Sequence, residues 1–211
     1  MKKLALILVP LLAASILATP AQKRVKQNTP ADFPTLIESA KQTWEAGDYG
    51  QCAGRLREAL ALCMVKRSEA ILAVLPAAPE GYVAEADRSM EQAANNPMMG
   101  ALAASVGNVV IQNYRGPEAI KVTITADSPL VGMVSMWITN PAMLDENSEL
   151  IEYGQHTAVL EKTNRDRARK LTILINGAHI CEVTYQGARE DFLFELFDQA
   201  AVDALAGVLG Q

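Results

Sequence analysis

The two histidines, His156 and His179, are the side chains best suited to acid–base chemistry near neutral pH. Neither has a second histidine four residues away or the Cys and His spacing typical of zinc sites. A hydrolase triad would need one of them beside Asp127 and Ser128, but the GxSxG turn that exposes a nucleophilic serine does not occur in the sequence. We therefore interpret both as satisfied surface or hairpin histidines, and a hydrolase site assembled from distant residues is the alternative.

Four carboxylates follow one another closely, at Asp145, Glu146, Glu149 and Glu152. Paired carboxylates can serve glycosidase or cation chemistry, but a catalytic acid needs a raised pKa and therefore burial, whereas this connection is polar. Their spacing also differs from that of an EF-hand loop. The sequence predicts solvated charge here, and we assign no catalytic residue, no metal and no cofactor.

The three cysteines are Cys52, Cys63 and Cys181. The first two lie 11 residues apart on one predicted helix, which separates them by roughly 16 Å along its axis. A disulfide needs Cα atoms within about 7 Å, so these two cannot pair on a continuous helix. We interpret all three as buried thiols that act as small hydrophobic side chains, ahead of a bridge to Cys181 or a catalytic thiol.

One predicted helix carries a methionine-rich apolar stripe. Met133, Met136 and Trp137 follow helical spacing, and Met143 lies just beyond the helix. A stripe of this kind usually packs into a core, and we favour that interpretation. The alternative is an adaptable surface for a partner protein or an apolar ligand.

The densest group of positive charge lies at the tip of a predicted hairpin. Its members are Lys162, Arg165, Arg167, Arg169 and Lys170. We favour a solvated hairpin end over a contact with acidic lipids or an acidic partner, for which Arg165, Arg167 and Arg169 are the candidates.

The first 21 residues have the features of a signal peptide. Lys2 and Lys3 precede an apolar run from Leu4 to Ala18, which is shorter than the roughly 20 residues of a membrane-spanning helix. We expect cleavage after Ala21, a periplasmic protein and no transmembrane segment after removal of the signal. The formal net charge then changes from −5 to 17 − 24 = −7, which argues against nucleic acid as a partner.

The remaining chain divides into four predicted parts. Residues 22–31 are a disordered leader, 32–75 a helical hairpin, 76–105 a linker and 106–211 an α+β domain. The order β-β-α-β-β-β-α predicts an antiparallel sheet with helices packed on one face.

Several predicted details concern the sheet and its ends. Alternating apolar residues predict a strand over 119–126. Gly154-Gln155 predicts a bend between two strand pieces, and Asn176-Gly177 a two-residue hairpin loop that would set Leu174 opposite His179. Residues 189–209 are expected to form one amphipathic helix, with a break near Ala201-Val202 as an option.

Two resemblances follow from local patterns. Residues 44–60, beginning Trp-Glu-Ala-Gly-Asp-Tyr, resemble a single tetratricopeptide unit, and the chain holds no second copy. Leu75-Pro-x-x-Pro-x-Gly-Tyr82 with the Asp-Ser-Pro at 127–129 resembles a group of uncharacterised exported bacterial proteins. That resemblance implies an exported α+β protein and brings no activity.

These observations predict a non-enzymatic binding or interaction module of the periplasm. Its expected partner is a protein or an apolar ligand. An envelope hydrolase and a structural homodimer, in which the helical hairpin pairs with its twin, are the alternatives.

Overall fold

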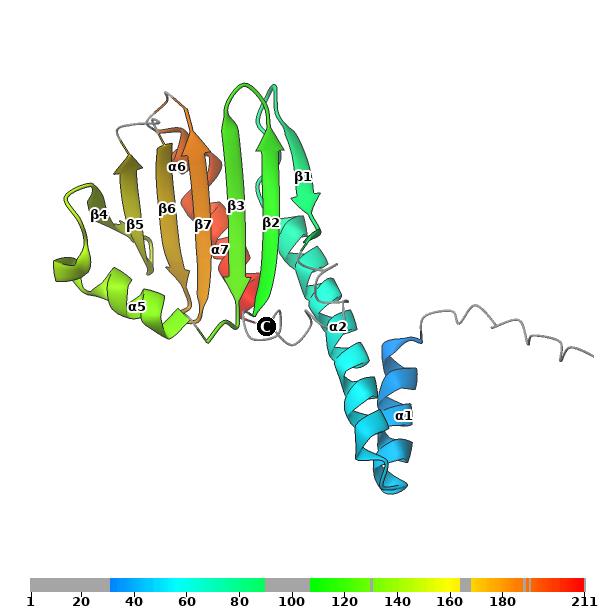
Figure 1. The fold of residues 1–211 in the computed structure, drawn as a ribbon. Helices are drawn as coiled ribbons and strands as arrows, with labels where there is room; N and C mark the ends of the chain where they lie inside the picture. The colour runs from blue at the N-terminus through cyan, green and yellow to red at the C-terminus, as the bar shows by residue number, and fades with distance from the viewer. Residues whose placement is uncertain are drawn as a thin grey trace, which may run out of the picture.

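The computed structural model describes residues 31–89, 107–129, 131–163, 168–187, 189 and 191–210 of the 211-residue chain. Two helices come first, followed by strands interrupted and ended by short helices (Figure 1). The helices are α1 (Phe33–Glu45), α2 (Tyr49–Val74), α5 (Val131–Thr139), η1 (Pro141–Met143), α6 (Phe192–Leu196) and α7 (Gln199–Leu209). The strands are β1 (Val83–Asp87), β2 (Asn108–Arg115), β3 (Ala119–Ala126), β4 (Ser148–Tyr153), β5 (His156–Thr163), β6 (Ala168–Ile175) and β7 (His179–Gln186).

The seven strands form one sheet in the order β1-β2-β3-β7-β6-β5-β4, and every neighbouring pair is antiparallel. The pairing of β3 with β7 joins the two halves of the sheet. The predicted fold class, a helical hairpin followed by an antiparallel sheet with helices, is confirmed.

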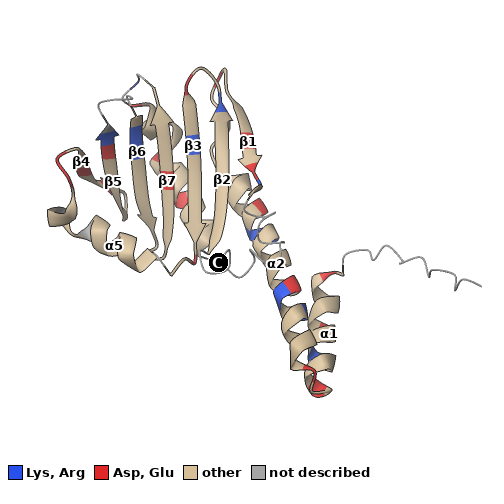
Figure 2. Cartoon of the chain, in the orientation of Figure 1, with Lys and Arg blue, Asp and Glu red and all other residues tan. Residues whose placement is uncertain are grey.

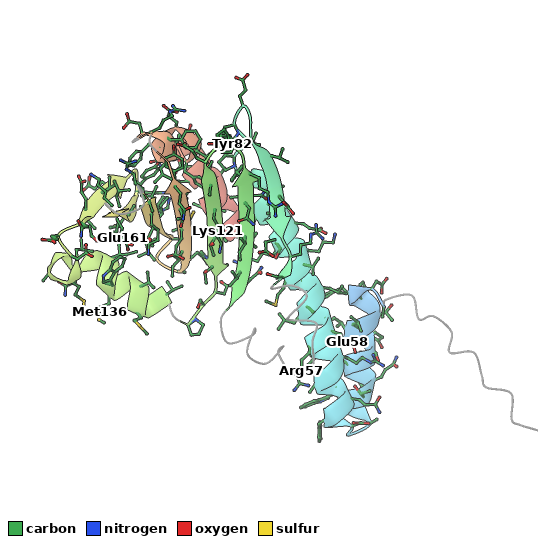
Figure 3. All side chains as sticks on the ribbon, turned by 45° about the horizontal axis from the view of Figure 1, so that its top comes forward. Arg57, Glu58, Tyr82, Lys121, Met136 and Glu161 are labelled. Carbon is green, nitrogen blue, oxygen red and sulfur yellow. The ribbon has the colours of Figure 1, made fainter. Side chains whose placement is uncertain are left out.

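The polar face of the sheet is visible in Figures 1 and 2, and α5 covers one end of it. Apolar residues of α5 pack there against Val159, Leu174 and Ile180. The rest of this face carries paired charges: Lys170 Nζ lies 3.0 Å from Glu161 Oε2 and 3.7 Å from Glu182 Oε1. Figure 3 shows Lys121 and Glu161 on this face and Met136 on α5. Helices therefore lie on both faces, and not on one alone as predicted, because α5 uses a second, smaller apolar cluster.

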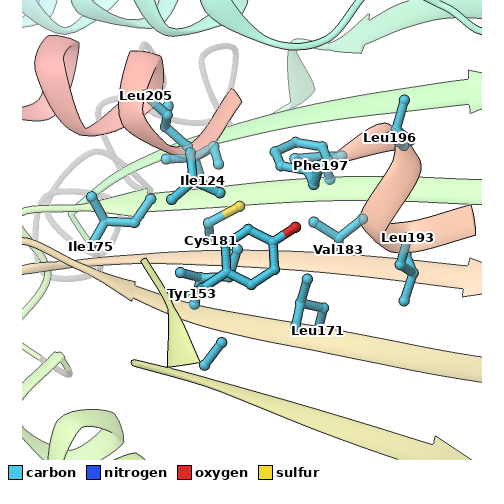
Figure 4. Close-up of a cluster of buried hydrophobic side chains, with 14 of the residues drawn as sticks. Ile124, Tyr153, Leu171, Ile175, Cys181, Val183, Leu193, Leu196, Phe197 and Leu205 are labelled. Atoms are coloured by element: carbon cyan, nitrogen blue, oxygen red, sulfur yellow. The ribbon is translucent and has the colours of Figure 1, made fainter. Parts of the chain in front are cut away.

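The main core fills the opposite face, under α2, α6 and α7 (Figures 1 and 4). Alternate residues of β3 are buried there, as the sequence predicts for a strand with one apolar face. Figure 4 shows Cys181 of β7 surrounded by Ile124, Tyr153 and Phe197. This core fixes the positions of the helices that cross it.

Helix α2 belongs partly to this core and partly to a projection. It has 26 residues, about 39 Å of helix. Ile71, near its C-terminal end, is fully buried in the main core. Its N-terminal half extends away from the sheet with α1 packed along it (Figure 1). We call α1 together with residues 49–63 of α2 the arm.

The ends of both arm helices follow from capping. Asp32 Oδ1 accepts a hydrogen bond from Thr35 N at 3.0 Å, and Asp48 Oδ1 accepts one from Gln51 N at 3.0 Å. Gly47 takes φ +77° between them, a left-handed conformation that glycine adopts without a steric penalty. The helical hairpin predicted over 32–75 is confirmed, as the helices Phe33–Glu45 and Tyr49–Val74.

Two connections within the sheet differ from their predictions. The loop between β6 and β7 has three residues and sets Ile175 opposite His179, so the predicted pairing of Leu174 with His179 is wrong by one residue. This register keeps each face uniform, because it places Thr172 opposite Glu182 and away from the core. Gly154-Gln155 forms a hairpin turn between β4 and β5, and not a bend within one strand.

Two further elements were not expected. Strand β1 lies inside the segment predicted to be a linker, and it pairs with β2 at the edge of the sheet. The C-terminal helix is interrupted at Phe197-Asp198, earlier than the optional break near Ala201-Val202, because Asp198 Oδ1 accepts from Ala201 N at 2.8 Å and caps α7.

Candidate functional site

The contact between α1 and α2 in the arm is formed by one leucine and three small residues. Leu36 and Ala40 of α1 and Cys52 and Ala59 of α2 are its buried residues. Short side chains let the two helices approach closely, but they bury little apolar area. The contact between α1 and α2, which we call the seam, therefore leaves most of the apolar residues of the arm uncovered.

Six large apolar side chains on the arm are 40–62% exposed. We call them the arm face: Phe33, Ile37, Trp44, Tyr49, Leu56 and Leu60. At the tip of the hairpin, the rings of Trp44 and Tyr49 meet edge to face with centroids 5.0 Å apart. This contact shows that α1 and α2 present their apolar stripes on the same side.

The spacing of these residues makes the arm face continuous. On each arm helix, four positions fall within a sector of roughly 60° around the helix axis. These positions are 33, 37, 40 and 44 in α1, and 49, 53, 56 and 60 in α2. Because the helices are antiparallel, these positions also share levels: 44 with 49, 40 with 53, 37 with 56 and 33 with 60. The arm face is thus a strip about 16 Å long across two helices.

The methionine-rich helix α5 and the following η1 form a second apolar surface. Met133, Met136 and Met143 are 65%, 58% and 51% exposed, so the favoured interpretation of the stripe as core is wrong for these three. Trp137 is half-buried and packs on the smaller apolar cluster between α5 and the sheet. The alternative interpretation of the stripe, as a binding surface, stays a prediction.

The predicted basic tip lies only partly within the described residues. Arg165 and Arg167 fall outside them. Arg169 is half-buried, and its Nη1 donates to the carbonyl oxygen of Arg189 at 3.5 Å. Lys170 forms ion pairs with Glu161 and Glu182 on the polar face of the sheet.

The structure brings His179 next to Asp127, but not in a catalytic arrangement. Ser128 is the next residue in the chain and is buried. Nδ1 of His179 accepts a hydrogen bond from Asp127 N at 3.3 Å, and the ring is also hydrogen-bonded to the Leu209 backbone. The Asp127 carboxylate forms an ion pair with Arg67, which donates to Leu209 O at 3.4 Å. The imidazole is thus held by backbone groups of two elements, which leaves no nitrogen to activate a hydroxyl.

Burial and the nearby Arg67 guanidinium lower the pKa of His179 below its ordinary value. The ring is therefore neutral at pH 7. It connects the end of β3, the start of β7 and the C-terminus of α7, beneath α2. We interpret His179 as the hairpin histidine that the sequence predicts, in a buried position.

His156 is also buried, and its Nε2 has no hydrogen-bond partner among the described residues. A surface depression of about 580 Å³ lies nearby and includes Gln155, Asn176, Gln199 and Asp203 in its lining. Gln199 Nε2 already donates to Asp203 Oδ1 at 2.7 Å, and Asn176 Nδ2 donates to Ala206 O at 3.1 Å. Because these polar groups bond to each other and the depression is open to solvent, it has few features of a ligand site.

The three cysteines are free thiols. Cys52 and Cys181 are buried, and burial raises the pKa of the Cys181 thiol. Cys63 is exposed on α2, so the interpretation of all three as buried is wrong for this one. Within the described ranges, no three His, Cys, Asp or Glu side chains gather closely enough to hold a metal ion.

Pairing of the helical hairpin with its twin is one alternative that the sequence supports, but the sequence alone did not identify the exposed residues of the arm face. Its signal was present, because α1 and α2 each carry more apolar positions than one helix–helix seam can cover. None of the helices in the described part of the chain has the length and apolar character needed to cross a membrane. Comparisons with protein-family models, curated proteins and solved structures give no match to this chain.

Proposed function

We propose that this protein is a non-enzymatic interaction module of the cell envelope, and that it binds a protein partner through the arm face. The observation that supports this most strongly is the exposure of six large apolar side chains on one side of a two-helix projection. Contiguous apolar patches on a monomer's surface often mark sites of protein interaction.

The composition of the arm face fits a protein partner. Trp and Tyr are the residue types most enriched among those that dominate binding energy, and Trp44 and Tyr49 lie together at its tip. A flat strip of two helices also suits a helical partner, which can pack its side chains between those of α1 and α2. A small apolar ligand would instead require a concave pocket.

An envelope hydrolase is the weaker candidate. His179 lies beside Asp127, and its hydrogen bonds to backbone groups support a structural role. The exposed methionines of α5 and η1 are a second candidate contact surface, but they number three against six exposed apolar residues on the arm.

The proposed function can be tested by photocrosslinking in the producing cell. A photoreactive amino acid at Leu56 should give a covalent protein adduct, because Leu56 lies in the arm face. The matched control is Glu58, two residues further along α2, which pairs with Arg55 outside the arm face. Equal crosslinking at both positions, or none at Leu56, Leu60 and Ile37, would refute the proposal.

A further inference from the structure

We infer that the partner of the arm face is the arm face of a second copy of this chain, so that two α1–α2 hairpins form a four-helix bundle. The inference rests on the proposed function, since it takes the arm face to be a docking surface, and it identifies the partner.

The arm is apolar on one side only. The six residues of the arm face share one side, while Arg55 and Glu58 form an ion pair at 3.0 Å elsewhere on α2. In a stack of repeats each unit needs two different apolar contact faces, one for each neighbour. In a two-fold dimer both copies use the same face. A single apolar face therefore fits a closed dimer of two identical chains.

The resemblance of this helix pair to one tetratricopeptide unit points the same way. Such units bury their faces against neighbouring units, and the chain contains no second one. Because this helix pair has one apolar face, a second copy of the chain can cover it face to face in place of a stacked repeat.

The charges at the edges of the arm face choose between two ways of pairing. Glu38 of α1 lies roughly 120° and Arg57 of α2 roughly 80° around the helix from the centre of the strip, each toward its own outer edge. Both are exposed, and Figure 3 shows Arg57 on the arm. Lys41 and Glu45 are also exposed on the outer edge of α1, so this edge has a formal net charge of −1 against +1 for Arg57 on the edge of α2. With a two-fold axis along the arm, α1 lies over α2 of the other copy, and Glu38 comes within about 3 Å of the level of the second copy's Arg57.

The other two-fold arrangement sets α1 over α1 and α2 over α2. In that arrangement the outer edge of α2, which carries Arg57, would lie against the same edge of the second copy. Two positive charges would then approach each other without an acidic residue on that edge, and their repulsion is unfavourable. The charges thus favour α1 against α2, with two reciprocal Glu38–Arg57 pairs and both sheets at the same end of the bundle.

The size of the arm face sets the expected strength. The arm face is about 16 Å long and roughly 20 Å wide, which gives about 320 Å² in projection. This area is below the roughly 800 Å² per partner of a standard interface. We therefore expect a reversible dimer with a dissociation constant in the micromolar range.

The first test is sedimentation velocity of the chain purified from the envelope of the producing cell, from about 1 to 200 μM. The expected result is a monomer–dimer equilibrium across this range. Leu56→Lys should weaken it by about 100-fold or more, because each dimer loses two apolar contacts and gains two buried charges. Met136→Lys is the matched control, an exposed apolar residue outside the arm, and should leave the equilibrium unchanged.

A charge exchange tests the arrangement. Glu38→Arg should weaken the dimer, and adding Arg57→Glu in the same chain should restore it. Glu38 and Arg57 lie on opposite outer edges of the arm and are too far apart to pair within one chain. Restoration of the dimer by the double substitution therefore requires a second copy. A dimer that is indifferent to both Leu56→Lys and the charge exchange would overturn the inference.

The outcomes also separate this inference from the proposed function. A monomer at every concentration that still gives an adduct with a different protein at Leu56 would overturn the second copy and leave the arm face as a docking surface. A monomer with no adduct would overturn both. Circular dichroism of each variant confirms that lost association does not come from unfolding.

Discussion

The packing of α2 into the sheet core leads to a quantitative prediction for Ile71→Ala. Ile71 is fully buried against the main core. The substitution removes three carbons at about 0.8 kcal/mol each, and the cavity left behind brings the expected destabilisation to about 3 kcal/mol. With a slope near 2 kcal/mol per M, the urea midpoint should fall by about 1.5 M.

The measurement is equilibrium unfolding followed by the fluorescence of Trp137, in a chain whose other tryptophan is removed by Trp44→Phe. Trp137 lies on α5, on the far face of the sheet from α2. A shift seen at Trp137 therefore means that α2 and the sheet unfold as one unit. Leu60→Ala, in the exposed part of the same helix, is the control and should change the free energy of unfolding by less than about 0.5 kcal/mol in the monomer.

A midpoint shift below about 0.5 M for Ile71→Ala would contradict this reasoning. So would a loss of helix signal without any change at Trp137. Either result would mean that α2 is an appendage whose contacts with the core contribute little to the stability of the sheet.

Three further predictions concern single side chains. Because the pKa of His179 is lowered in the folded protein, the unfolded chain binds more protons below about pH 6.5. The free energy of unfolding should therefore fall as the pH drops from 7.5 to 5.5, by at most about 1.4 kcal/mol per pH unit from this group. His179→Asn should reduce this pH dependence, measured by urea titrations at each pH. An unchanged pH dependence in the variant would contradict the prediction. One thiol per native chain, Cys63, should react rapidly with Ellman's reagent while the two buried thiols react only in denaturant, and Cys63→Ser should abolish the fast phase. His156→Leu should raise stability by about 1 kcal/mol in thermal unfolding, because it removes a buried nitrogen that has no partner among the described residues. A clear loss of stability would indicate that this nitrogen binds a water or ligand.

The elements with strong local signals could be predicted from the sequence. The alternation over 119–126 matches β3, and Asp32, Gly47 and Asp48 set the ends of α1 and α2 through caps and a left-handed turn. These features depend on neighbours in the chain, so the sequence contains most of the information needed.

Features that depend on distant partners could not be predicted. β1 is a mostly exposed edge strand with weak alternation, and it forms because β2 offers a free edge. The register at Asn176-Gly177 depends on which residues face the core, and not on the turn residues alone. The residues of the arm face were not identified because an apolar stripe is assigned to a core by default. Only the fold reveals that no other element of the described residues covers this one.

The order of the strands also has a consequence for how quickly the chain can fold. Residues paired between β3 and β7 are 53 to 67 positions apart in sequence, from 179 − 126 to 186 − 119. Paired residues in every other strand pair are at most 115 − 83 = 32 positions apart. Closing the longest loop has the largest entropic cost, so each half of the sheet can assemble as a local meander before the halves join. We expect the β3–β7 pairing to set the folding rate, and conservative substitutions in β1 or β4 to change mainly the rate of unfolding.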